Sequence, residues 1–386
     1  MAENKKFNAW LPNFGAKGWG ITIACFIFFY FYSFWNAATN TLFGLFNEMY
    51  GWQQTDMSYV ITIAGWISLI AVVLFGTLGR KIGAKMVSVI GLAGSAIGFA
   101  VLACAHTFEV FAAGVVIFNF SMVAYATIGV GLLGSSWFPR TKGAFMGIAT
   151  MGMTISSATL NPIILGFAGS AFGISGFFWA MAAVVAITAV IVFLFVKNNP
   201  EEAGAYPDND QSVSREELEA EFKAAQEYKK TSPWTTARVL KTPQTWLIGL
   251  GTGLPMMVGA GTIALLVPTL ASYGQDPMFG VVLLSSMWPI GLLGHYLIGV
   301  LDQKIGTKKT TLVVICVLGL GGLLVRLGGA NSVVCAVATG MFMFGLSGAA
   351  NVCMSLTASI YGREDFEVAY TPIQVIFNVL NFAGVS

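Results

Sequence analysis

Few residues in the apolar part of this chain carry a group that could bind a charged ligand, and His295 is the most conspicuous of them. It lies in the run SSMWPIGLLGHYLIG (residues 285–299), four residues before Gly299. An imidazole can donate hydrogen bonds to an anion and can gain a positive charge near neutral pH, which would couple binding to protonation. The alternative is a neutral, hydrogen-bonded histidine that only packs against its neighbours.

Polar and aromatic side chains recur at helical spacing within other apolar runs. An aromatic wall with a few amides suits a small organic ligand, so we expect such residues to line a cavity. In lipid the same residue types also make hydrogen bonds between helices, which is the alternative for each of them. The candidate binding residues, together with His295, are Tyr32, Trp35, Asn36, Tyr125, Asn351, Gln374 and Asn378.

Carboxylates are missing from the middle of the apolar runs, which disfavours a carboxylate proton relay and favours antiport or facilitated exchange. The sequence also lacks a glycine-rich nucleotide loop, an HExxH motif and a nucleophile elbow. It has no CxxC motif or nearby histidine pair that would hold a metal. We therefore predict neither an enzyme nor a cofactor or metal site.

The elements that must position these residues are predicted to be membrane-spanning helices. The chain of 386 residues is 56% hydrophobic and only 10% charged, with a mean hydropathy of +0.75. Soluble domains carry about 25% charged residues, so lipid must surround most of this surface. The net charge of +2 gives no indication of a nucleic-acid partner. We predict an all-α integral membrane protein.

Spanning a bilayer takes about 20 apolar residues in a helix, and this length divides the chain into three parts. Residues 1–196 form a predicted six-helix bundle, with runs near 19–47, 58–79, 84–105, 108–136, 142–168 and 173–196. Residues 197–242 form a linker with one short polar helix in SREELEAEFKAAQEYKK. Residues 243–386 hold five runs, near 243–272, 277–300, 308–328, 330–360 and 368–386, of which the last is expected to be cut short.

Basic residues predict the orientation, because cytoplasmic loops are enriched in lysine and arginine. The basic residues of the N-terminus, of the linker and of the loops near residues 80–85, 140–142 and 304–309 share one side if the runs alternate. We therefore expect a multi-pass protein of the cytoplasmic (inner) membrane, with the N-terminus and the linker in the cytoplasm.

Two loops repeat one pattern, GTLGRKIGAK (residues 76–85) and GVLDQKIGTKK (residues 299–309). In both, two glycines flank six residues and basic residues follow. Glycines allow a tight turn and close helix approach, and basic residues can meet helix C-termini, so the pattern could lock one conformation. The predicted gating residues are Gly76, Arg80, Lys81, Gly83, Gly299, Lys304 and Gly306.

This pattern resembles the loop 2–3 signature of the major facilitator superfamily, whose acidic position is Arg80 in the first copy and Gln303 in the second. Asp302 lies one position away. Three stretches, MYGWQQTDMS, SSWFPRTKGAFMGIATMG and TASIYGREDFEVAY, are similar to the oxalate/formate antiporter and monocarboxylate porter groups. The resemblance implies a fold of two six-helix repeats, here with 11 spans visible and the twelfth missing, and a monomer.

The resemblance also implies a substrate class. His295 occupies the place where oxalate/formate members often carry an arginine, and Phe377 and Asn378 stand where dicarboxylate members have a lysine. Charge matching then disfavours a dianion and favours a small organic monoanion, carried by alternating access. The alternatives are a carrier of a neutral or amphipathic solute, a non-transporting sensor that uses the linker as its output, and a carrier inactive without a twelfth span.

Overall fold

The computed structural model describes residues 10, 12–328 and 330–384. The first nine residues and the last two, which the predicted first and third parts include, lie outside the described residues.

The part before the linker consists of helices that cross the predicted membrane six times. Long apolar helices are expected there because lipid leaves every backbone polar group to be satisfied within the protein. The elements are α1 (Gly15–Tyr32), α2 (Phe34–Tyr50), α3 (Gln54–Ala103), α4 (Phe108–Met122), a π-helix (Val123–Gly129), α5 (Val130–Trp137), α6 (Lys142–Ala168) and α7 (Gly173–Phe195).

Three irregularities interrupt these helices. The first span breaks at Ser33, between α1 and α2. Helix α3 contains two spans, because Gly83 interrupts it with φ 84° and ψ 164°. The fourth span is α4, the π-helix and α5 in succession, and π-helical segments are rare and frequent at functional sites.

The linker contains two short 3-10 turns (Glu201–Ala203 and Pro207–Asn209) followed by α8 (Arg215–Thr231) and α9 (Thr236–Lys241). Helix α8 is the polar helix that the sequence predicts. Ser214 and Glu217 form a capping box at its start, where each side chain satisfies the other residue's backbone N–H. Acidic residues in the first turn and lysines in the last suit the helix dipole.

The part after the linker consists of α10 (Pro243–Ser272), α11 (Pro277–Ser286), α12 (Trp288–Ile305), α13 (Thr307–Gly328) and α14 (Ser332–Ala383). Helices α11 and α12 together make one span, broken at Met287 just before Pro289. Gly362, with φ 71°, divides α14 into two spans. The described residues thus make eleven passages, and the predicted all-α fold is confirmed.

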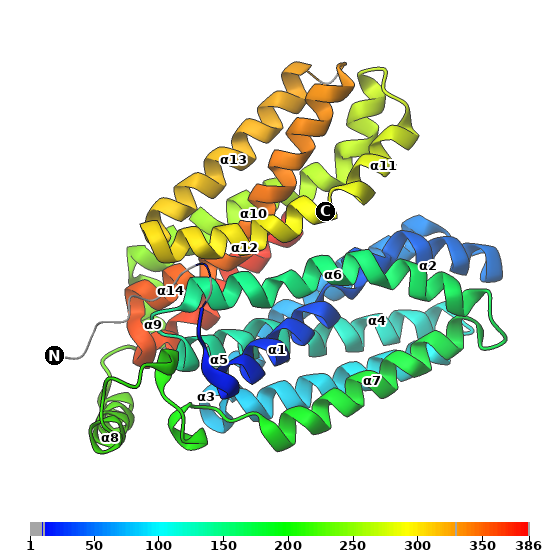
Figure 1. Cartoon of the computed structure of the whole chain (residues 1–386). Helices are drawn as coiled ribbons and strands as arrows, with labels where there is room; N and C mark the ends of the chain where they lie inside the picture. Colours follow the sequence, from blue (N-terminus) through cyan, green and yellow to red (C-terminus); the bar gives the residue numbers. More distant parts are fainter. Residues whose placement is uncertain (1–9, 11, 329, 385–386) are drawn as a thin grey trace.

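The two parts meet at the end of the molecule that carries the linker, which we call the linker end. Helices α6 and α12 pack against each other there, and so do α3 and α14. Toward the opposite end, α11 and α13 rise away from α2 and α4 (Figure 1). The contact of α3 with α14 continues along these helices, from Gly76 beside Thr371 to Gly65 beside Phe382.

Candidate functional site

Glycines bring α6 and α12 into backbone contact at the linker end. A Cβ atom added to Gly299 would lie 2.6 Å from the carbonyl oxygen of Gly143 and 2.9 Å from the Cα of Gly147. A Cβ atom added to Gly147 would lie 2.8 Å from the carbonyl oxygen of His295. The crossing therefore depends on residues without side chains, as small-xxx-small helix contacts do.

In both parts of the chain, the repeated motif supplies a glycine at a helix crossing and a second glycine at a turn. Its first glycines, Gly76 and Gly299, lie at crossings between the parts, since Gly76 faces Thr371 of α14. Its second glycines, Gly83 and Gly306, adopt nearly the same left-handed conformation, with φ 84° in each and ψ 164° and 154°. Only glycine adopts that backbone without strain, so both turns depend on these residues.

The basic residues of the motif do not make the contacts that its glycines make. Arg80 and Lys81 are exposed, and Lys304 lies over the ring of Trp10 at 4.3 Å from its centroid. Asp302 is 7% exposed and lies beside Gly143, in the first turn of α6. A helix N-terminus carries a partial positive charge, so this carboxylate favours the closed contact between α12 and α6.

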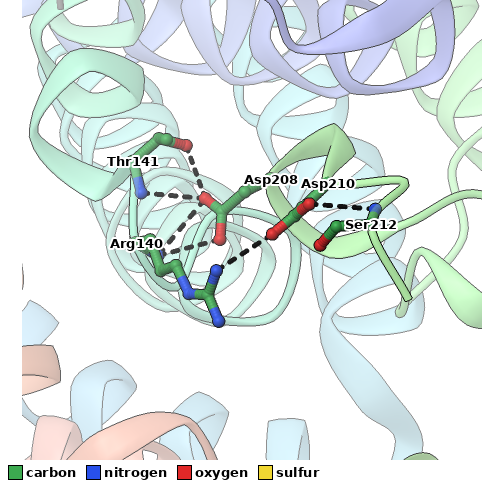
Figure 2. Close-up of polar contacts among 5 residues, drawn as sticks. All are labelled: Arg140, Thr141, Asp208, Asp210 and Ser212. Carbon is green, nitrogen blue, oxygen red and sulfur yellow. Dashed lines mark hydrogen bonds and ion pairs between the residues drawn. The ribbon is translucent and has the colours of Figure 1, made fainter. Parts of the chain in front are cut away.

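A second carboxylate near the start of α6 is that of Asp208 in the linker, which binds Arg140 and Thr141 just before the helix begins (Figure 2). It accepts hydrogen bonds from the backbone N–H of Arg140 (3.0 Å) and from the N–H (2.8 Å) and hydroxyl (2.6 Å) of Thr141. Burial raises the pKa of Asp208, and these donors oppose that rise. Arg140 forms an ion pair with Asp210 at 3.0 Å. Sequence reasoning did not assign Asp208 a role. An acidic residue in a linker on the same side as the basic loop at residues 140–142 could have indicated this contact.

His295 lies at the crossing of α6 and α12 and is 5% exposed. Its Nδ1 atom has no hydrogen-bond partner among the described residues, and neither has Oδ1 of Asn351. The Asn351 amide donates to the carbonyl of His295 at 3.5 Å. Buried polar atoms are rarely left unpaired unless water or a ligand serves them, so this pair is a candidate for binding.

Gln374 and Asn378 lie on the second span of α14, and Gln374 faces its first span. The Gln374 amide donates to the Cys353 sulfur at 3.7 Å, and the Asn378 amide donates to the Gln374 carbonyl at 2.8 Å. All of these groups are buried. The structure thus gathers four predicted residues, His295, Asn351, Gln374 and Asn378, on α12 and α14.

Two tyrosines predicted on the first part, Tyr32 and Tyr125, approach the second part. Tyr32 lies close enough to Tyr125 and to Tyr370 of α14 to interact with both electrostatically. Tyr125 is fully buried in the π-helix, where Ser95 donates to its hydroxyl at 3.5 Å. Tyr370, which sequence reasoning did not include, packs on Gly131 of α5. The place of Tyr370 in the span that follows Gly362 could have suggested it as a further candidate.

Trp35 and Asn36 lie at the start of α2, after the irregularity at Ser33. Trp35 is 5% exposed and packs against Phe111 and Phe118 of α4, with ring centroids 6.2 and 6.5 Å away. Asn36 is exposed. The Trp35 Nε1 atom is buried and has no hydrogen-bond partner among the described residues. A binding role for Trp35 and Asn36 stays a prediction.

Comparison with known proteins gives one family and a set of solved structures. The model of the Major Facilitator Superfamily matches residues 21–385. The E. coli fucose:proton symporter FucP is similar with TM-score 0.67 and 13% identity, covering 96% of this chain and 91% of that one. The proton:xylose symporter XylE bound to 6-bromo-6-deoxy-D-glucose has TM-score 0.64 and 14% identity, with 95% and 87% covered. The comparison with curated protein sequences gave no match.

Proposed function

We propose that this chain, which belongs to the major facilitator superfamily and is a secondary transporter that works by alternating access, carries a small organic anion of the monocarboxylate type. It is a carrier and not an enzyme. We place the anion between the two parts, at His295 and Asn351, with Tyr32 and Tyr370 beside it. In this fold the substrate lies near the bilayer midplane between the repeats.

The observation that carries the proposal is the unpaired Nδ1 atom of His295 beside the unpaired Oδ1 atom of Asn351. A protonated imidazole would supply one positive charge to a carboxylate, and this suits a monoanion better than a dianion. The Asn351 oxygen could accept a hydrogen bond from a hydroxyl of the same substrate. Exchange of one anion for another needs no membrane-embedded carboxylate, which agrees with the sequence.

The orientation is part of the proposal. We take the linker end as cytoplasmic, because the basic loops and the linker gather there. The contact of α6 with α12 then closes the cytoplasmic side, and the substrate would enter from the opposite end. A cysteine placed at the exposed Lys223 of α8 should react with an impermeant thiol reagent only after spheroplasts are opened.

A second candidate function is transport of a neutral solute such as a sugar. It is favoured by the two structural neighbours, which are sugar:proton symporters, and by the buried amides of Asn351, Gln374 and Asn378. Amides and tyrosine hydroxyls suit the hydroxyls of a sugar as well as they suit a carboxylate.

The test is uptake into proteoliposomes of labelled formate, lactate, oxalate, xylose and fucose, with and without the same solute inside. We expect internal monocarboxylate to accelerate monocarboxylate uptake. We expect His295→Gln to reduce this uptake at least tenfold, because a charge-assisted hydrogen bond contributes about 1.5–3 kcal/mol. The chain has one other histidine, His106, which is exposed, and His106→Gln is the matched control.

Sugar uptake without uptake of any acid would replace the anion proposal by the second candidate. Acid uptake that His295→Gln and His106→Gln leave equally intact would remove His295 from the site while keeping the carrier.

A further inference from the structure

The linker helix α8 is held to the rest of the molecule by polar contacts. None of its residues is buried. Leu218, Phe222 and Ala225 are half-buried on one face, at helical spacing. A helix with so little apolar contact can separate from its neighbours at low free-energy cost, as elements of low local stability do.

The end of α8 binds a short segment of α14 just after the break at Gly362. The Tyr228 hydroxyl donates to the Asp365 carboxylate at 3.0 Å, and the Ser232 hydroxyl donates to the same carboxylate at 2.5 Å. Lys229 pairs with Glu367 at 3.0 Å. The Asp365 carboxylate raises the pKa of the Tyr228 hydroxyl, which therefore keeps the proton that it donates.

The other end of the linker binds the first part of the chain. Asp208 caps the start of α6 through Arg140 and Thr141. Asn198 accepts a hydrogen bond from the backbone N–H of Lys85 at 2.9 Å, at the turn after Gly83. The linker is therefore anchored to the first part at its beginning and to the second part at its end.

One ion pair joins the beginning of the linker directly to α14. Arg363 binds both carboxylate oxygens of Glu201, at 2.8 and 3.0 Å, and only 5% of the Glu201 side chain is exposed. Both oxygens accept from one guanidinium nitrogen, and a pair that is this far buried is screened less by solvent and salt than an exposed one. It lies on the same segment of α14 that α8 binds.

A cavity of about 270 Å³ lies beneath α8, between these contacts. It is lined by Ser135 and Ser136 of α5, by Phe222 and Lys229 of α8 and by Arg363 of α14. The first part, the linker and the second part therefore all line this one cavity. Close packing would fix α8 in place, whereas the cavity leaves fewer contacts to break when the helix separates from its neighbours.

We propose that α8 is a latch that holds the linker end closed and must release the 363–367 segment of α14 before the two parts can separate there. Because α8 is tethered to the first part and docked on the second, separation stretches its contacts to Asp365 and Glu367, together with the linker pair of Glu201 with Arg363. The latch rests on the alternating access assigned above and not on the identity of the substrate.

The test uses purified full-length protein in nanodiscs, with the exposed Cys104 and Cys316 replaced and with Thr371→Cys as a reporter of opening. Thr371 is 8% exposed and faces Gly76 across the contact of α14 with α3, so N-ethylmaleimide reaches a cysteine there only when the linker end opens. We expect Asp365→Ala to accelerate labelling about tenfold or more, because it removes two hydrogen bonds to a carboxylate. Lys229→Ala should accelerate it by about twofold to fivefold, and high salt should mimic this smaller effect.

Lys223→Ala, on the same helix but without a charged partner within the described residues, is the matched control and should leave the rate unchanged. Cys25 is completely buried in the first part, and its labelling reports unfolding. Unchanged Thr371→Cys labelling in Asp365→Ala would overturn the latch, and so would an equal acceleration in Lys223→Ala. Cys25 labelling that rises with Thr371→Cys labelling would assign the effect to unfolding and would also reject it. No substrate is needed, so a failed uptake assay does not affect the result.

Discussion

The substitution Gly299→Ala tests whether the contact of α6 with α12 sets the conformational equilibrium. The added Cβ atom would lie 2.6 Å from the Gly143 carbonyl oxygen, whereas ordinary Cβ contacts begin at 3.4 Å. The helices must therefore move apart by the difference, 3.4 − 2.6 = 0.8 Å. No rotamer change can relieve the clash, because the opposing atoms belong to the backbone.

Overpacking of this kind costs about 1–3 kcal/mol. The open state, in which the two helices have separated, does not bear this cost. The ratio of open to closed molecules should therefore rise by roughly 5- to 150-fold.

The assay is pulsed electron paramagnetic resonance between spin labels at Arg80→Cys and Lys308→Cys, after the exposed Cys104 and Cys316 are replaced. Both labelled positions are exposed, and they lie in the two copies of the repeated loop, one in each part of the chain. In the parent protein we expect one short distance. In Gly299→Ala we expect a second, longer distance to gain population.

The matched control is Gly319→Ala in α13, where an added Cβ atom meets nothing within 4 Å. It makes the same chemical change in a helix without the crossing, so the distances should stay as in the parent. An unchanged distribution in Gly299→Ala would refute the reasoning, because it would mean that the closed contact absorbs the extra atom without opening.

Two further substitutions test local features by thermal unfolding in detergent. Asp208→Ala removes three hydrogen bonds at the start of α6 and should lower the free energy of unfolding by about 1–2 kcal/mol. Asp210→Ala, which removes an exposed ion pair with Arg140 and an exposed hydrogen bond from the Ser212 backbone N–H, should lower it less, by about 0.5 kcal/mol, and equal losses would contradict the capping role. Gly306→Ala places an alanine at φ 84° with no atom within 4 Å of its Cβ, so it should lose about 1–2 kcal/mol through backbone strain alone. A Gly306→Ala protein as stable as the parent would show that this turn relaxes.

The sequence predicts the number of passages because each one needs an apolar run of fixed length, and lipid tolerates little else. The breaks at Gly83 and Gly362 were predicted as loops between runs, and both residues have positive φ. The π-helix was not predictable, because residues 123–129 carry no proline or charged residue that would indicate a change from α-helical hydrogen bonding.

The candidate site was predictable only in part. Polar side chains in apolar runs were identifiable from their cost in lipid, which selected His295, Asn351, Gln374 and Asn378. The surroundings of each side chain were not predictable: Trp35 is buried against rings of α4, whereas Asn36, the next residue, is exposed. The role of Asp208 depends on a linker fold that no periodicity describes.

The paired turns at Gly83 and Gly306 bear on how such chains are recognised in genomes. Both copies of the motif keep the glycines and their backbone shape, while the acidic position is Arg80 in one and Gln303 in the other. The shape of these turns therefore does not depend on an acidic residue at that position. A genome survey that demands the aspartate would overlook this chain, whereas one that asks for two glycines with six residues between them, twice and about 220 residues from each other, would find it.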